Sequence, residues 1–291
     1  MEGILNIDKP QWLSSHDVVA RVRRICNTRR VGHAGTLDPL ATGVLLVCVG
    51  RATRLSEYLM GQRKTYTATV RLGQTTNTYD AEGEVTEERP FSHITSSDIE
   101  KALETFRGPI EQIPPIYSAL KVDGQPMYKL ARAGKDVERK PRPVTIYALD
   151  LVDWTPPNLQ LRVICSTGTY IRSLAHDIGD FLGCGGHITV LRRTAVGDFN
   201  ISDAVSLETL QAEEWESFCL PSDEAVTILP RLNASEEETK ALLLGQRIPY
   251  SPEQPQESPV RVYDPLSQFF GILLREDDMW RPKKMFPPES G

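Results

Sequence analysis

The order of strand-like and helix-like segments constrains the fold of this chain more than any other feature of its sequence. Two strand-like runs, residues 144–154 and 159–167, follow each other across the short connection "TPPN" with no helix between them. Parallel neighbours need a long crossover connection, usually a helix, whereas antiparallel neighbours need only a turn. The sequence therefore predicts an α+β fold with a mixed, largely antiparallel sheet flanked by helices.

Two helices of this fold have clear sequence signals. Ser14 or Ser15 can cap the first, and apolar residues at positions 18, 19, 22 and 25 then fall on one face. The second runs through "GTYIRSLAHDIGDFLG", with apolar residues at positions 171, 174, 178 and 182 facing inward and Gly183 at its end. Residues 74–90, by contrast, predict only a polar, acidic connection.

The length of the chain predicts two domains. At 291 residues it is longer than one ordinary core supports. A change of character falls near residues 221–232, and beyond it short strand patterns follow one another. We therefore expect a catalytic domain at residues 1–228 and a small β-rich module at residues 229–291.

Several classes of protein are disfavoured by simple patterns. The five cysteines form no CxxC pair, and no HExxH motif occurs, so neither a disulfide framework nor a metal site is predicted. The start of the chain lacks the pattern of a signal peptide, and no run of 18 apolar residues occurs. A reducing, cytoplasmic setting without a membrane partner fits these observations best.

The charge of the chain is distributed unevenly. The net charge is −6, yet residues 1–74 contain 11 Lys and Arg against 5 Asp and Glu, while residues 201–291 contain 8 against 17. A local basic face, rather than the overall charge, is what binds a polyanion such as RNA. By itself, such a bias is more often ordinary solvated surface charge.

The stretch "VGHAGTLDPLATGVLL" contains one carboxylate, Asp38, among small and apolar residues. Pro39 restricts the backbone on both sides of the peptide bond that follows Asp38, so the acid has a stiff support. An Asp before Pro is also typical of a simple turn. No phosphate-binding glycine motif and no second acid accompanies it, which leaves a nucleophile or a point charge beside a developing cation. A buried carboxylate needs a cation to stay ionised, and Arg172 in "GTYIRS" is the candidate.

Four ordered blocks of this sequence resemble the bacterial tRNA pseudouridine-55 synthases, the TruB family. "GHAGTLDPLATGVL" resembles the catalytic motif of that family nearly letter for letter. The other blocks are "KTY" at residues 64–66, "IPPIYSALKVDGQPMYKLARAG", and "GTYIRSLAHDIGDFLGCGGHITVLRRTAVGDF". The resemblance covers about residues 3–230, and the remaining tail is similar to the small PUA-like RNA-binding module of the family.

The resemblance implies an isomerase that acts on tRNA. A uridine in the T-loop, position 55, would be cleaved at its N1–C1′ bond, and its uracil would rotate and rejoin the ribose through C5. No cofactor and no metal are expected, and the partner is the T-arm stem-loop of tRNA, bound by a monomer. The resemblance leaves open whether Asp38 attacks C6 of uracil or C1′ of ribose, or assists an elimination.

The resemblance also assigns roles to particular residues. It implies that Asp38 is the nucleophile, that Tyr66 stacks on the target base and that Arg172 pairs with the acid. His33 would fill the gap that the flipped base leaves. The residues expected at the substrate are His33, Lys64, Tyr170 and Leu191. Two alternatives remain, a non-catalytic tRNA-binding or folding protein on the same fold and a hydrolase with a single Asp nucleophile.

Overall fold

The computed structural model describes residues 1–118, 120–122, 124–127, 130 and 138–287. Within these residues, the main sheet has nine strands, which are β1 (Gly3–Lys9), β2 (Val31–His33), β3 (Thr42–Val49), β4 (Lys64–Leu72), β7 (Gly108–Gln112), β10 (Arg142–Thr155), β11 (Asn158–Cys165), β12 (Gly186–Val196) and β13 (Phe199–Asn200). Seven of them lie in the order β1-β3-β12-β4-β11-β10-β7, while β2 pairs with β3 and β13 with β12. All the described pairs are antiparallel except β3 with β12, which are parallel. The predicted mixed, largely antiparallel sheet is confirmed.

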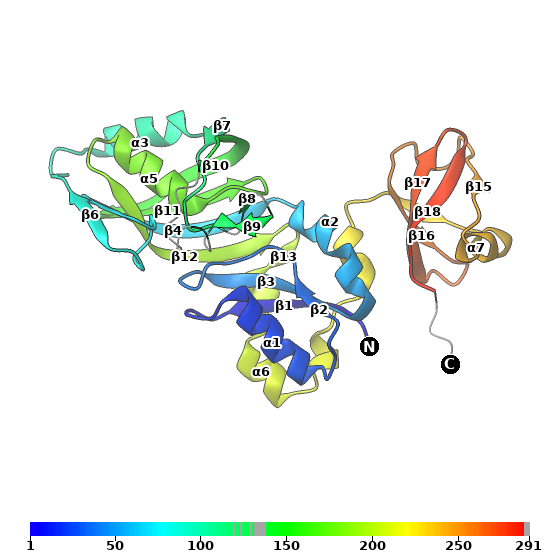
Figure 1. Ribbon diagram of the computed structural model, residues 1–291. Coiled ribbons are helices and arrows are strands. Elements are labelled where there is room, and N and C mark those ends of the chain that lie inside the picture. Colours follow the sequence, from blue (N-terminus) through cyan, green and yellow to red (C-terminus); the bar gives the residue numbers. More distant parts are fainter. Residues whose placement is uncertain (119, 123, 128–129, 131–137, 288–291) are drawn as a thin grey trace.

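Helices lie on both halves of this sheet. The α-helices that the structure describes are α1 (Ser15–Ile25), α2 (Ser56–Met60), α3 (Ser96–Thr105), α5 (Ile171–Phe181), α6 (Leu207–Ala212) and α7 (Glu236–Leu243). Four 3-10 helices accompany them in the same residues, which are η1 (Gly50–Leu55), η2 (Ile201–Asp203), η3 (Trp215–Phe218) and η4 (Ser222–Val226). Figure 1 shows α3 and α5 together over the half of the sheet that contains β10 and β11, with α1 and α6 beside β1 at the other half.

The first helix begins where the sequence predicts. Ser14 is its N-cap: its hydroxyl accepts from the Asp17 main-chain N–H at 3.1 Å, and Asp17 Oδ2 accepts from the Ser14 N–H at 2.9 Å. This reciprocal pairing satisfies two of the amide groups that a helix start leaves free. Val18, Val19 and Val22 are buried, as their spacing predicts.

The helix that carries Arg172 packs unusually close to the sheet. A Cβ on Gly179 would lie 2.2 Å from the Gly186 main-chain nitrogen, so only glycine allows α5 to approach the start of β12 this closely. Ile171, Leu174 and Ile178 are buried on the same side of the helix. The close approach fixes the distance of the whole helix from the strands that line the site.

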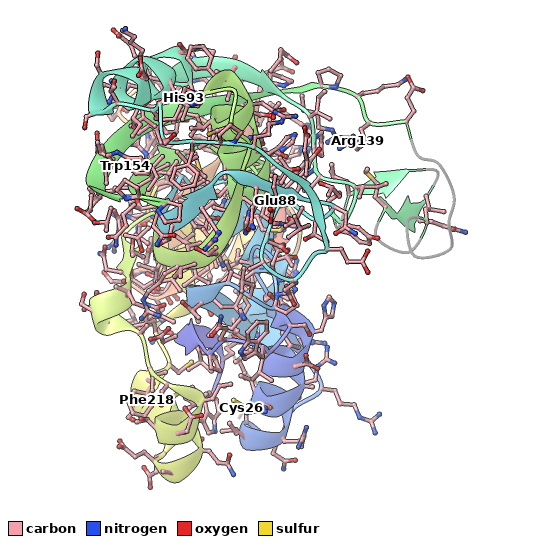
Figure 2. The ribbon with its side chains drawn as sticks, turned by 90° about the vertical axis from the view of Figure 1, so that its left-hand side faces the viewer. Cys26, Glu88, His93, Arg139, Trp154 and Phe218 are labelled. Carbon is pink, nitrogen blue, oxygen red and sulfur yellow. The ribbon has the colours of Figure 1, made fainter. Side chains whose placement is uncertain are left out.

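Residues 74–90 differ from the prediction of a plain connection. They form a two-stranded hairpin of β5 (Gln74–Thr76) and β6 (Val85–Glu88). Its loop returns to the main sheet, because Asp80 forms an isolated bridge with Ile188 of β12. The polar composition hid the hairpin, because all of β6 is exposed and has no buried face to produce an alternating pattern. A second small hairpin, β8 (Lys121–Val122) with β9 (Gln125–Pro126), projects from the body on the side where Arg139 lies (Figure 2).

The last part of the chain forms a second sheet. Its strands are β14 (Arg231–Asn233), β15 (Ile248–Pro249), β16 (Val260–Tyr263), β17 (Phe269–Glu276) and β18 (Met279–Met285), in the order β14-β16-β17-β18-β15. Trp280 is fully buried, together with Leu242 and Leu273, in a hydrophobic cluster that is separate from the core of the main sheet. The sheet also contacts the main body, since Ile272 packs in one cluster with Leu55. The β-rich character predicted for this module is confirmed, and Figure 1 shows it beside α2.

Candidate active site

A cleft of ≈ 320 Å³ opens where the Asp38 loop, the start of β4 and the start of α5 meet. Six of the seven residues predicted for the site line it, which are Asp38, Lys64, Tyr66, Tyr170, Arg172 and Leu191. They come from segments up to 153 positions apart, between Asp38 and Leu191, and the sheet brings them together. The cleft is of the size that small ligands occupy in proteins.

Hydrogen bonds from two buried side chains, Ser15 and Lys9, hold the loop that carries Asp38. Ser15 is buried, and its hydroxyl accepts from the Leu37 N–H at 2.9 Å and lies 3.1 Å from the Leu37 carbonyl. Lys9 is also fully buried, and its Nζ donates to the carbonyls of Leu13 at 2.7 Å and Pro39 at 3.4 Å. Both residues flanking Asp38 are therefore fixed, which gives the acid the stiff support that Pro39 predicts.

Arg172 joins two carboxylates. Its Nη2 donates to Asp38 Oδ1 at 3.1 Å, and its Nε lies 2.9 Å from Asp38 Oδ2. Its Nη1 lies 3.2 Å from Asp80 Oδ2. Main-chain carbonyls take further protons of the guanidinium, Thr78 from Nη1 at 3.1 Å and Tyr117 from Nη2 at 2.9 Å. The geometry fixes one edge of the guanidinium on Asp38 and leaves it little freedom to turn.

The two acids differ in their exposure. The Asp80 side chain is 3% exposed, whereas 36% of the Asp38 side chain is exposed and faces the cleft. Burial raises the pKa of the Asp38 carboxyl; Arg172 lowers it again, and the nearby charge of Asp80 raises it. Asp38 is thus the carboxylate that a ligand in the cleft would meet, with Asp80 behind the arginine.

Asp80 itself is anchored in its loop. Its Oδ1 accepts from the Thr78 hydroxyl at 2.6 Å and from the Glu82 N–H at 3.1 Å. Tyr79, between Thr78 and Asp80, has a φ of 63°, and its ring stacks on His176 with centroids 3.9 Å apart. His176 lies one turn after Arg172 on α5, so a single helix holds this loop by both residues.

Aromatic and apolar side chains form the walls of the cleft. Tyr66 and Leu191 are buried, and burial raises the pKa of the Tyr66 hydroxyl, so the phenol stays neutral at ordinary pH. Gln112 positions Tyr170: its Oε1 accepts from the Tyr170 N–H at 2.8 Å, and its Nε2 donates to the Tyr170 carbonyl at 3.1 Å. Aromatic and apolar side chains beside a carboxylate offer a surface on which a planar, uncharged base can stack.

Two cations lie deeper than sequence reasoning predicts. Arg193 is 1% exposed, and it donates to the carbonyls of Val44 at 2.7 Å and Gly35 at 3.1 Å, on either side of the Asp38 loop. The Lys64 ammonium donates to the carbonyls of Met60 and, at 2.7 Å, Gln62, and burial lowers the pKa of Lys64 to about 8. Through these contacts with main-chain carbonyls, Arg193 and Lys64 stabilise the walls of the cleft.

His33 is the predicted site residue that does not line the cleft. It lies on β2, just before the Asp38 loop, with its ring edge-on to His16 and the two centroids 5.3 Å apart. Burial lowers the pKa of His33 to about 4, so the ring is neutral. Its Nδ1 is buried and has no hydrogen-bond partner among the described residues.

Four residues of the site were missed by sequence reasoning, which are Lys9, Asp80, Gln112 and Arg193. Asp80 lies in a stretch that the sequence describes as a solvated acidic connection, and its partner is 92 positions away. A buried Lys9 directly before Pro10 gives no separate signal, since a lysine there is normally expected on the surface. Gln112 and Arg193 act on main-chain atoms, and no residue pattern reports such contacts.

Within the described part of the chain, His, Cys, Asp and Glu side chains form no group of three or more that could hold a metal ion. None of the helices that the structure describes has the length and apolar character that a membrane crossing requires.

Family models match almost the whole chain. The model described as "TruB family pseudouridylate synthase (N terminal domain)" matches residues 23–171, and "tRNA pseudouridylate synthase B C-terminal domain" matches residues 172–227. A third, "Pseudouridine synthase II TruB, C-terminal", matches residues 230–286. The Asp38 loop falls in the first match and Arg172 begins the second.

Curated relatives and a solved structure agree with these matches. Proteins named "tRNA pseudouridine synthase B" are 42% identical in Haemophilus influenzae (strain PittEE), over 98% of this chain and 95% of the relative, and 47% identical in Pseudomonas aeruginosa (strain UCBPP-PA14), over 96% and 93%. One from Clostridium kluyveri is 43% identical over 98% of this chain and 100% of its own length. A chain in a solved Cbf5-Nop10-Gar1 complex has a TM-score of 0.76 and 26% identity, covering 98% of this chain and 85% of that one.

Proposed function

Because the chain belongs to the TruB family of pseudouridylate synthases, we propose that it converts a uridine of tRNA into pseudouridine, at position 55 in the T-loop. The observation that carries this proposal is the contact between Asp38 and Arg172, 134 positions apart, at the floor of a cleft with apolar walls. A turn aspartate would have no need of a buried arginine from another element.

The reaction is an isomerisation that needs one ionised carboxylate. The N1–C1′ bond breaks, the uracil turns within the cleft, a C5–C1′ bond forms, and the proton on C5 is lost while N1 gains one. Asp38 acts as the nucleophile, which is bonded to the substrate between the breaking of the N1–C1′ bond and the formation of the C5–C1′ bond. Arg172 keeps Asp38 ionised and aims one of its oxygens into the cleft.

The walls of the cleft receive the base. A uridine in a folded loop is stacked, so it must leave the stack to reach Asp38. The Tyr66 ring and the Leu191 side chain offer the replacement surface, and stacking of this kind contributes about 1–3 kcal/mol per base. Tyr66 is neutral, and it stays neutral as it takes the C5 proton if its own hydroxyl proton leaves at the same time, to N1 or to solvent.

The rest of the RNA would bind across the basic stretch of residues 1–74. Arg21, Arg24, Arg29, Arg30 and Arg63 are exposed. Such residues contact phosphates and position the RNA, while loop shape and unstacked bases determine which site is modified. Arg54, another basic residue of this stretch, instead donates to the Met285 carbonyl of the second sheet at 2.7 Å. We propose that residues 1–228 form the catalytic domain and residues 229–291 a module that extends the RNA surface, in a cytoplasmic monomer.

One reaction tests this function. Unmodified tRNA, or a T-arm stem-loop, is incubated with the full chain, and pseudouridine is mapped along the RNA. We expect modification at the T-loop uridine alone, abolished by Asp38→Asn and retained in Asp203→Asn, a matched change at an exposed aspartate. Unchanged modification by Asp38→Asn would contradict the role of Asp38, and modification elsewhere would contradict the site.

A further inference from the structure

Trp12 lies in the loop between β1 and α1 with its side chain turned to solvent. Its exposed fraction is 62%, and its φ is 68°. Glycine adopts this left-handed conformation freely, whereas a bulky residue adopts it only with strain. The chain thus maintains a large exposed ring at a position where the backbone would favour glycine.

The loop of Trp12 is tied to the catalytic loop. The Trp12 N–H donates to the Pro39 carbonyl at 2.8 Å, one residue after Asp38. Lys9, fully buried, binds the same Pro39 carbonyl and also the carbonyl of Leu13. In Figure 1 this loop is the dark-blue segment to the left of α1. The indole is therefore presented from a firm support beside the catalytic acid.

The Trp12 ring lacks a specific partner within the described residues. Among the described residues, the Trp12 indole has no stacking, cation–π or side-chain hydrogen-bond partner. The other three tryptophans differ: Trp154 and Trp215 pack against the main core, and Trp280 is buried and donates to Gln254 Oε1 at 2.8 Å. Strain of this kind persists mostly at functional positions, where surrounding contacts hold it in place.

We propose that Trp12 is a binding residue for the RNA, and that its indole stacks on an unpaired base of the T-loop next to the uridine that enters the cleft. This inference rests on the proposed function for the identity of the RNA. Aromatic side chains bind unpaired bases through their flat faces, and such stacking does not depend on the base sequence. RNA is favoured over a protein partner because the ring stands beside the loop that must meet the substrate.

Binding measurements separate the ring from the backbone. In the Asp38→Asn background, we compare Trp12→Gly, which removes the ring and relieves the strain, with Trp12→Phe, which keeps a ring. We expect the dissociation constant for a T-arm stem-loop to rise about tenfold in Trp12→Gly and to stay within about threefold in Trp12→Phe. The thermal midpoint of Trp12→Gly should be equal or higher, so the loss cannot come from unfolding. Ile228→Gly, at a residue 70% exposed outside the second sheet, is the control and should bind normally.

Fluorescence gives a direct readout of stacking. Binding of the RNA to Asp38→Asn should quench the tryptophan emission, and Trp12→Phe should lose most of that quenching while binding is retained. Normal RNA affinity in Trp12→Gly, or unchanged quenching in Trp12→Phe, would overturn the inference. Pseudouridine formation is scored separately with Asp38 intact. If the unmodified chain makes pseudouridine and Trp12→Gly binds RNA normally, only the role of Trp12 is refuted. If the unmodified chain makes no pseudouridine and Trp12→Gly binds RNA more weakly, only the proposed function is refuted.

Discussion

Arg172 on α5 and Asp80 in the loop after β5 form a buried ion pair, 3.2 Å between Nη1 and Oδ2, on the opposite side of the guanidinium from Asp38. Both partners are at most 6% exposed, so the pair is screened very little by solvent. The arginine is thus fixed before any substrate arrives. Preorganisation of this type places the charge where it is needed and avoids reorganisation during the reaction.

Asp80→Asn tests whether the fixed arginine matters for turnover. The change removes the charge that anchors Nη1, so the guanidinium stays paired with Asp38 but is held less rigidly. We expect the single-turnover rate to fall at least about tenfold, RNA affinity to stay within about threefold, and the free energy of unfolding to fall by about 1–3 kcal/mol. The matched control is Asp150→Asn, whose ion pair with Arg162 is half-exposed on both sides and should matter little. A loss of RNA affinity equal to the loss of rate would show that Asp80 acts on binding instead.

The pH dependence of kcat/KM follows from the shifted pKa of Asp38. Because the reaction needs the ionised acid, activity is present above this pKa and is lost as the pH falls through it. Burial raises the pKa of Asp38, so the acid limb should lie above the ordinary aspartate value of about 3.9. The Asp80 charge also raises the pKa of Asp38, so Asp80→Asn should move the limb to lower pH. Rate profiles between about pH 4 and 8 check both statements, and a limb that moves upward in Asp80→Asn contradicts this electrostatic account.

Gly43→Ala tests the attachment of the catalytic loop to β12. Gly43 has a φ of 99°, and a Cβ there would lie 2.1 Å from the Arg193 carbonyl oxygen. Gly108 is the control, because it has a φ of 88° with nothing within 4 Å of an added Cβ. Gly108→Ala should cost about 1 kcal/mol of unfolding free energy through backbone strain alone, and Gly43→Ala at least about 2 kcal/mol more through the clash. Equal midpoints in denaturant titrations of the two variants would show that the clash is relieved at no cost.

The basic face predicts that RNA binding weakens steeply with salt. Arg30 is exposed and lies three residues before His33. If it contacts a phosphate, Arg30→Gln should weaken binding and reduce the slope of log Kd against log salt by about 1. Arg162, which lies on β11 outside residues 1–74 and 3.4 Å from Asp150, provides the control, and Arg162→Gln should leave the slope unchanged. A nearly flat salt dependence of the unmodified chain would rule out the basic face as the RNA surface.

The parts of the structure that were predictable from sequence are those with a local cause. Ser14 and Asp17 form a capping box through contacts three residues apart, and Val18, Val19 and Val22 fall on one helical face by spacing alone. The pairing of residues 144–154 with 159–167 follows from a connection too short for a crossover. Asp38 and Arg172 could be matched because a family resemblance supplied the long-range information.

The parts that were not predictable depend on contacts between distant segments. Asp80 looks like a solvated acid until the β5–β6 hairpin folds its loop against Ile188 and under Arg172. Lys9 and Arg193 have basic side chains that bind main-chain carbonyls in the interior, and neither composition nor periodicity distinguishes such residues from surface ones. Trp12 reads as an ordinary apolar residue, because its strain and exposure depend on a backbone angle that the sequence does not report.

The central claim, that this chain shifts the attachment of a uracil to C1′ of the same ribose from N1 of the base to C5, is tested most directly by tritium at C5 of the T-loop uridine. Forming the C5–C1′ bond expels that hydrogen, so we predict that one tritium is released to water per pseudouridine formed and that no free uracil appears. With Asp38→Asn we predict neither tritium release nor pseudouridine. A hydrolase would release uracil that keeps its tritium, and an RNA-binding protein would release nothing. Either of those results with the unmodified chain would contradict the account.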